Sequence, residues 1–188
     1  MTYHLNWLLN TIETGQPLEY LFFWGHQPAA DGRITASCLS QWWEAPFVVE
    51  EQVFATAEHW MMAQKARLFD DEEIYPQILL APTPSEAKAL GRKVSAFDQG
   101  VWEKHRFEIV VQGNYHKFSQ HEALKSFLLD TAPTVLVEAS PRDRIWGIGM
   151  GAQNPLASQP AYWQGQNLLG FALMEVRDRL AATVQTRL

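Results

Sequence analysis

Residues 56–65 read Thr-Ala-Glu-His-Trp-Met-Met-Ala-Gln-Lys, the pattern of a helix whose charged side chains lie among apolar ones. Thr56 is a candidate N-cap, so the sequence predicts a helix that continues to about Phe69. Steps of three and four residues place Glu58 on one broad face with Phe54, Met61, Met62 and Lys65. An acidic side chain among Phe, Met and Trp is unusual for a solvated helix face.

Two interpretations of Glu58 remain open at this point. A first-turn acid commonly stabilises the helix dipole, and the pattern alone favours that role. The alternative is a functional carboxylate in a partly apolar site, where burial and the helix N-terminus act on its pKa in opposite directions.

Further helices are expected on both sides of this one. The clearest start signal is Thr83-Pro84-Ser85-Glu86, a capping box with Pro at the first helical position. The other expected helices are residues 3–13, about 70–79, 100–118, 119–129 and 166–180.

Only a few short strands are expected. Residues 20–24 form an apolar run typical of a buried strand, and residues 134–137 form another strand. Residues 47–49 and 53–54 predict a hairpin that turns near Glu50 and Glu51, without the Asn-Gly or Asp-Gly that usually marks such a turn. The sequence therefore predicts an α+β fold: one compact, mostly α-helical domain over residues 1–188, with a core at about 20–180.

Composition limits the classes of function. The 188 residues carry a formal net charge of −6, which argues against non-specific binding to nucleic acid. Cys38 is the only cysteine, so an intrachain disulfide is impossible and a cysteine-based zinc site is implausible. No apolar run reaches the length of a membrane span and no signal peptide is visible, so we expect a cytoplasmic protein without a membrane partner.

A second group of charged residues lies in Pro-Arg-Asp-Arg-Ile-Trp-Gly-Ile-Gly, residues 141–149. Arginines such as Arg142 and Arg144 can bind a phosphate, and the N–H groups of the glycine-rich loop at 147–151 can form an anion nest. The alternative is a tight turn with a surface ion pair, which the spacing slightly favours.

Trp102 lies near the start of the expected helix 100–118, where it can stack on a base or pack in the core. Core packing is the more common position of a tryptophan. The sequence contains neither the H-E-x-x-H motif of a zinc protease nor the G-x-S-x-G motif of a serine hydrolase.

Taken together, several segments resemble the NADAR domain family of YbiA-like N-glycosidases. They appear in the family's order and extend over roughly residues 20–180. The matching segments are Leu39–Trp43, Ala57–Trp60, Ala63–Ala66, Ala89–Arg92, Val101–Trp102, Arg142–Gly149 and Gly165–Gly170. The resemblance implies a compact, largely helical fold with a polar cleft, and hydrolysis of N-glycosidic bonds without a metal or organic cofactor.

The resemblance also implies roles for individual residues. The catalytic positions are Glu58, Asp143 and Trp102, which we expect to converge on one concave site. The substrate-binding positions are Trp42, Lys65, Arg92, Arg144, Trp146, Gly147, Gly149 and Asn167. One departure is Gln41-Trp42, which replaces the Asn-Phe of the family and can reshape the substrate pocket.

Three functions remain open. The first is hydrolysis of the bond between a base and a phosphoribosyl or ADP-ribosyl group, such as that of a riboflavin-pathway intermediate. The second is removal of ADP-ribose from modified guanine in nucleic acid; the acidic pI disfavours it, but a basic strip around Arg92, Lys93 and Arg106 would favour it. The third is a non-catalytic module that binds ADP-ribose or NAD derivatives. Paired carboxylates argue against this third function, since a pure binder of an anion has no need of them.

Overall fold

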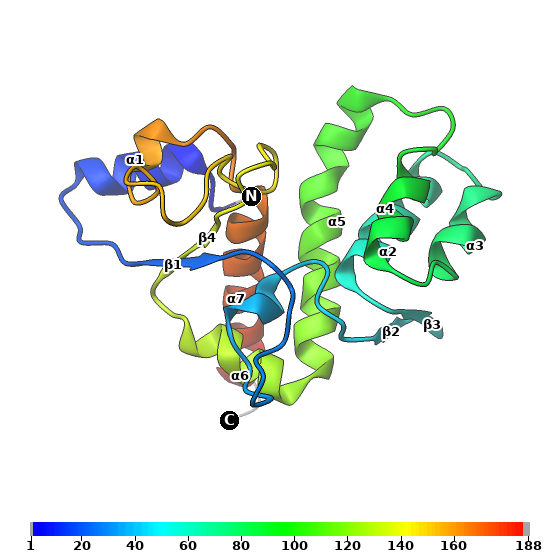
Figure 1. Cartoon of the computed structure of the whole chain (residues 1–188), viewed down its shortest axis with the longest axis horizontal. Helices are drawn as coiled ribbons and strands as arrows, with labels where there is room; N and C mark the ends of the chain where they lie inside the picture. The colour runs from blue at the N-terminus through cyan, green and yellow to red at the C-terminus, as the bar shows by residue number, and fades with distance from the viewer. Residues whose placement is uncertain (1, 186–188) are drawn as a thin grey trace. The chain divides into compact units, whose positions relative to one another are not determined.

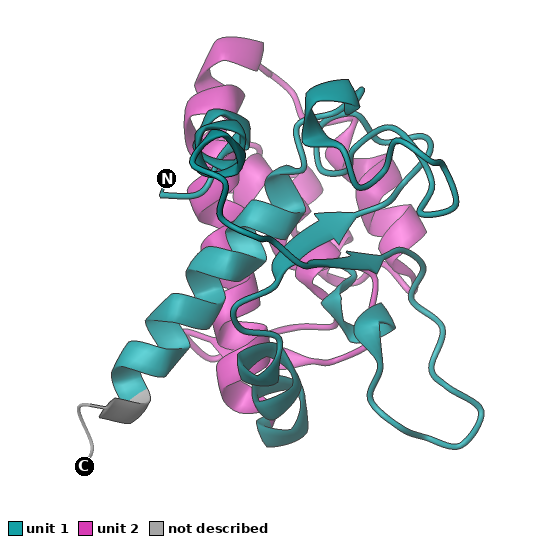
Figure 2. Ribbon diagram, turned by 90° about the vertical axis from the view of Figure 1, so that its left-hand side faces the viewer, with its two compact units in different colours: residues 1–40, 122–188 teal, residues 41–121 magenta. Residues whose placement is uncertain are grey.

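The computed structural model describes residues 2–185. It confirms the α+β class, since helices dominate and the strands are few and short. Internal contacts divide the chain into two compact units, residues 41–121 and residues 1–40 with 122–188 (Figure 2). The expected organisation as one domain stays a prediction.

The unit of residues 41–121 is built around one buried helix. Its elements are β2 (Phe47–Val49), β3 (Gln52–Phe54), α2 (Ala57–Leu68), α3 (Ile74–Leu79), α4 (Pro84–Gly91) and α5 (Gln99–Gln120). Helix α2 packs against α3, α4 and α5, which surround it in Figure 1. Most of its residues are therefore buried, the acidic Glu58 among them. The expected helices at 56–69, 70–79, 84–91 and 100–118 are confirmed, with shifts at some ends.

The hairpin turns where the sequence predicts, and its backbone is unusual. Strands β2 and β3 are antiparallel, with Phe47 opposite Phe54 and Val48 opposite Val53. Glu50 and Glu51 form the turn with φ angles of 49° and 67°. These angles lie in the left-handed region that glycine and asparagine normally occupy in such hairpins, so two glutamates hold a turn that their side chains disfavour.

The second unit joins the two ends of the chain. Its elements are α1 (Leu5–Glu13), β1 (Tyr20–Phe23), η1 (Ala36–Leu39), α6 (Glu122–Asp130), β4 (Val135–Glu138), η2 (Pro160–Tyr162) and α7 (Leu168–Gln185). Strands β1 and β4 pair in parallel, with Tyr20 opposite Val135, and α7 packs on β4 (Figure 1).

Two details of this unit differ from the sequence prediction. The first strand ends at Phe23, and Trp24 is 62% exposed, although residues 20–24 were expected to be one buried strand. In a sheet of two strands β1 has a single neighbour, so only Phe23 of its four residues is fully buried. The last helix runs from Leu168 to Gln185, beginning and ending later than the expected 166–180.

Among residues 2–185, no helix combines the length and the apolar character that crossing a bilayer requires.

Candidate active site

Glu58 lies in the first turn of α2 and is buried, with only 2% of the residue exposed to solvent. Thr56 is the N-cap of the helix, and its Oγ1 accepts a hydrogen bond from the N–H of His59 at 3.4 Å. The N–H of Glu58 donates to the carbonyl oxygen of Gln41 at 3.0 Å. A solvated acid at a helix start does not describe this residue, because almost none of it reaches solvent.

Two buried amides hold the start of α2, and the sequence analysis did not identify them as a pair. Asn114 Nδ2 on α5 donates to Gln41 Oε1 at 2.7 Å and to the carbonyl oxygen of Val110 at 2.9 Å. Gln41 Nε2 in turn lies 3.5 Å from the carbonyl oxygen of Ala57. The available signal was Asn114 four residues after Val110 and four before Phe118, on one face of the expected helix.

His59 also holds the start of this helix. Its Nε2 lies 3.0 Å from the carbonyl oxygen of Ala81 and therefore donates there. Its Nδ1 then accepts from the hydroxyl of Thr56 at 2.8 Å. Burial lowers the pKa of His59, partly offset by the bond to Ala81, so the ring is held neutral.

Lys65 lies seven residues after Glu58, on the same face of α2. Its side chain reaches an aromatic cluster formed by Phe97 and Trp102. Its Nζ donates to the carbonyl oxygen of Gly91 at 2.8 Å and lies 4.1 Å from the ring centroid of Phe97 and 5.8 Å from that of Trp102. Burial lowers the pKa of Lys65, and the positive charge of Arg92 lowers it further. The charge of Arg92 thus acts on Lys65, which itself lies beside two aromatic rings, and an anion would stabilise this pair of cations.

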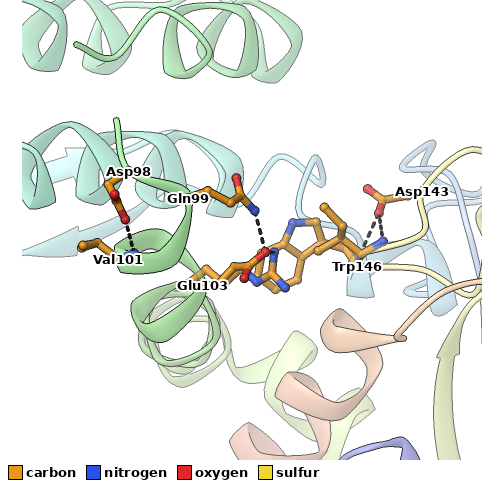
Figure 3. Close-up of polar contacts among 8 residues, drawn as sticks. Asp98, Gln99, Val101, Glu103, Asp143 and Trp146 are labelled. Carbon is orange, nitrogen blue, oxygen red and sulfur yellow. Dashed lines mark hydrogen bonds and ion pairs between the residues drawn. The ribbon is translucent and has the colours of Figure 1, made fainter. Parts of the chain in front are cut away.

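Trp102 is both a core residue and a neighbour of this lysine. It is 8% exposed and lies near the start of α5, where Asp98 Oδ1 accepts from the N–H of Val101 at 2.7 Å (Figure 3). Core packing, the commoner alternative from the sequence, is therefore correct. The contact with Lys65 is an additional feature that spacing did not reveal.

The remaining predicted residues of this unit differ in their exposure to solvent. Arg92 is exposed at the end of α4, and Trp42 is half-buried with Lys88 Nζ at 5.9 Å from its ring. Arg106 is only 7% exposed, with Glu103 at 3.8 Å. The basic strip that would have favoured nucleic acid therefore loses one of its three members.

Asp143, in the other unit, builds a tight turn with its own carboxylate. Its Oδ1 accepts from the N–H groups of Ile145 at 2.8 Å and Trp146 at 2.7 Å (Figure 3). Its N–H donates to Ser140 Oγ at 3.2 Å, and its carbonyl oxygen accepts from Gly149 at 3.0 Å. The tight turn expected as one alternative is present, and Asp143 is the residue that forms it.

The glycines of this loop allow close packing of its backbone. A Cβ at Gly147 would lie 2.9 Å from the carbonyl oxygen of Glu138, and one at Gly165 would lie 2.3 Å from that of Gly147. The N–H of Ile148 donates to Glu138, as that of Gly149 does to Asp143. These two N–H groups are therefore already used within the fold, because protein carbonyls accept from both. The anion site expected at Arg144 and residues 147–151 stays a prediction.

Asn167 serves the same packing. It is fully buried at a φ of 54°, its Oδ1 accepts from the N–H of Glu138 at 2.9 Å, and its Nδ2 donates to the carbonyl oxygen of Leu136 at 2.9 Å. The side-chain amide thus forms hydrogen bonds with the backbone of β4, as a neighbouring strand would. Both ends of the side chain are engaged within the fold, and its contact with substrate stays a prediction.

Arg144 and Trp146 lie closer to solvent. Arg144 is exposed, with Nη2 donating to Gln164 Oε1 at 3.2 Å, and Trp146 is half-buried. The structure thus gathers Lys65, Arg92 and Trp102 in one unit, and Asp143 and Trp146 in the other. Convergence of Glu58, Trp102 and Asp143 on one concave site stays a prediction. Within residues 2–185, no group of three or more His, Cys, Asp or Glu side chains could hold a metal ion.

Comparisons with known proteins agree on one family. The model of the NADAR domain matches residues 22–181. An N-glycosidase of Acanthamoeba polyphaga mimivirus is 39% identical over 165 residues, which cover 85% of this chain and 95% of that protein. The N-glycosidase YbiA of Escherichia coli is 34% identical over 136 residues, covering 72% of this chain and 76% of YbiA.

A solved structure extends the similarity to the fold. The NMR structure of the Escherichia coli protein YbiA superposes with a TM-score of 0.71 at 29% sequence identity. The match covers 89% of this chain and 88% of YbiA.

Proposed function

Because this chain belongs to the NADAR domain family, and its curated relatives include N-glycosidases, we propose that it hydrolyses the N-glycosidic bond between a base and a phosphorylated ribosyl group. A riboflavin-pathway intermediate is a substrate of this kind. The N-glycosidase class rests on the family. The phosphorylated substrate and the residue roles rest on the burial of Glu58 and on the contacts of Lys65.

The observation that carries the proposal is the placement of an acid and a cation on one face of α2. Glu58 and Lys65 are seven residues apart, which is nearly two full turns, or about 10 Å along the helix axis. Lys65 lies beside Trp102, and the positive charge of Arg92 acts on it. A ribose phosphate can therefore bind with its phosphate at the two cations and its anomeric carbon toward Glu58.

The chemistry requires negative charge at that carbon. As the bond to the base breaks, its electron pair leaves with the base nitrogen, and positive charge develops on the anomeric carbon and ring oxygen. The Glu58 carboxylate stabilises this charge, and it takes a proton from the water that adds to the carbon. The proton that Glu58 takes from the water passes on to the departing base nitrogen, which restores the carboxylate, and the products are the free base and the ribose phosphate.

Asp143 is proposed as the second carboxylate, which assists departure of the base. Because its Oδ1 already accepts two backbone hydrogen bonds, we assign it a smaller share of the charge stabilisation than Glu58. Arg144, exposed near this turn, is proposed to contact the substrate.

A small molecule fits better than modified nucleic acid. The net charge is −6 and Arg106 is buried, so a basic surface for a polynucleotide has little support. A non-catalytic module fits less well, because a buried carboxylate such as Glu58 would weaken binding of an anionic ligand without contributing to any reaction.

The test incubates the purified protein with two substrates, a phosphoribosylated aminopyrimidine and an oligonucleotide carrying ADP-ribosyl-guanine. Released base and sugar phosphate are measured by mass spectrometry, with the Glu58→Gln variant as control. We expect release from the phosphoribosylated compound and almost none with the variant. Release from the oligonucleotide alone would contradict the small-molecule substrate, and binding of either compound without release would contradict catalysis.

A further inference from the structure

Phe97 carries no sequence motif, and its ring lies closer to the Lys65 ammonium than that of Trp102 does. Lys65 Nζ lies 4.1 Å from its centroid, closer than the 5.8 Å to Trp102. Phe97 is 41% exposed, so it is not a core residue placed by burial alone. An ammonium at this distance from a ring face is attracted by the negative charge density of the π system.

The segment that carries Phe97 is fixed on both sides. Before it, Ser95 donates from its N–H at 2.7 Å and from its Oγ at 2.9 Å to Asp71 Oδ2. These bonds lower the pKa of Asp71, the backbone bond from Ser95 most of all. After it, Asp98 caps α5 through Val101.

Two more features set the direction of the ring. Ala96 has a φ of 51°, a left-handed conformation that is costly for alanine. The ring of Phe97 meets that of Phe69 edge-on, with centroids 5.3 Å apart. A strained backbone residue held between fixed neighbours is typical of segments that place a functional side chain.

We propose that Phe97 is a positioning residue, whose ring face holds the Lys65 ammonium in place for the phosphate of the substrate. The proposal rests on the proposed function for the identity of the anion. An ammonium has three N–H groups, and one donates to the carbonyl oxygen of Gly91. A phosphate bound beside the ring accepts the others.

The same ring keeps the lysine charged. Burial and the nearby Arg92 both disfavour the charged form, and both therefore lower the pKa of Lys65. The π face of Phe97 acts in the opposite direction, since it stabilises the cation and not the neutral amine. Removing the ring while keeping apolar cover should therefore lower the pKa further.

The first experiment measures that pKa directly. Proteins labelled with ¹³C at the lysine ε-carbons are titrated by NMR, and the Lys65 signal is assigned with Lys65→Arg. Phe97→Leu should lower the pKa of Lys65 by about 0.5 to 1 unit, the shift expected for loss of one cation–π contact. Phe97→Tyr should retain the parent value, and so should Tyr162→Leu, which removes a different exposed aromatic ring. An unchanged pKa in Phe97→Leu, or an equal fall in Phe97→Tyr, would overturn the proposal.

The second experiment measures anion binding, with ribose 5-phosphate as the probe in calorimetric titrations. Phe97→Leu should weaken binding by about threefold to tenfold relative to the parent, and Phe97→Tyr should restore it. Equal affinity in all three proteins would overturn the positioning role. If the parent binds no ribose 5-phosphate while its Lys65 pKa still depends on the ring, the phosphate of the proposed function is wrong and the contact between Phe97 and Lys65 stands.

Discussion

The two carboxylates that the family resemblance selects are held in opposite ways. Glu58 is placed through its backbone N–H and through the groups around the helix start, namely the Thr56 cap and the amides of Gln41 and Asn114. Asp143 is placed by its own side chain, whose Oδ1 accepts two backbone hydrogen bonds. Backbone hydrogen bonds already occupy one oxygen of the Asp143 carboxylate, so less of its negative charge is available to a substrate. We therefore expect Glu58 to supply most of the charge stabilisation and Asp143 mainly to hold its loop.

The largest expected effect is that of Glu58→Gln. The amide keeps the size of the side chain and removes the charge, so the protein should fold. Loss of one electrostatic stabiliser should lower kcat about 100-fold to 1,000-fold. KM should change little, because the positive charge of the sugar develops mainly in the transition state. Steady-state kinetics and a thermal melt of the variant test both statements, and a folded variant with parental kcat would remove Glu58 from the mechanism.

Two substitutions of Asp143 separate its structural role from a catalytic one. Asparagine retains an oxygen for the N–H groups of Ile145 and Trp146, whereas alanine leaves both without this acceptor. Asp143→Ala should therefore lower the free energy of unfolding by about 1 to 3 kcal/mol, and Asp143→Asn by clearly less. Activity per folded molecule should fall less than tenfold in Asp143→Asn, in line with a secondary role.

These values come from denaturant unfolding and steady-state kinetics on both variants. If Asp143→Asn unfolds like the parent yet loses as much kcat as Glu58→Gln, the two carboxylates share the chemistry equally. The unequal division of roles would then be wrong.

Between about pH 5 and 7.5, stability should depend on pH in part through His59, at the start of α2. Burial lowers the pKa of His59 below its usual value of about 6.5, so the unfolded chain binds a proton more readily than the folded protein. Stability is then fully present above about pH 6.5 and falls as the pH decreases toward the lower folded pKa, by at most about 1.4 kcal/mol per pH unit.

Denaturant unfolding between pH 7.5 and 5 measures this slope. His59→Gln should be less stable at neutral pH, because the bonds to Thr56 and Ala81 are weakened, but its stability should fall less steeply with acid. A second histidine, His116, also has a pKa lowered by burial, so His116→Asn should remove a separate part of the slope and shows how much of it does not come from His59. Identical slopes for the parent and His59→Gln would show that His59 is not the group that titrates.

The two regions also differ in how much of each the sequence could predict, because one depends on local contacts and the other on contacts between distant residues. Helix α2 was predictable because Thr56 and the apolar spacing are local signals that act over three or four residues. The parallel pairing of β1 with β4 was not, since it joins Tyr20 to Val135 and no local signal encodes such a partner. The role of Asn167 depends on that same sheet edge and was equally hidden.

Lys65 and its aromatic neighbours were predicted in part. Lys65 and Trp102 were selected by resemblance, but their contact was not predicted. Phe97 was missed altogether, because its position depends on the φ of Ala96 and on the bonds from Ser95 to Asp71. Alanine in a left-handed conformation leaves no mark in a sequence, whereas a glycine there would have been a signal.

The smallest expected effect concerns the hairpin, which lies in the same unit as α2 but outside the groups that hold Glu58. Replacing Glu50-Glu51 by Asn-Gly should raise the free energy of unfolding by about 1 kcal/mol, because both residues tolerate the left-handed φ angles that the turn requires. The replacement also removes two negative charges from a chain of net charge −6, so a double glutamine variant is needed as the control for charge. That control should gain little stability, since glutamine has the same strain as glutamate. If the start of α2 is held by its cap and amides as argued, kcat and KM should equal the parent's in both variants. A stabilised hairpin that changes kcat would show that the position of Glu58 also depends on β2 and β3.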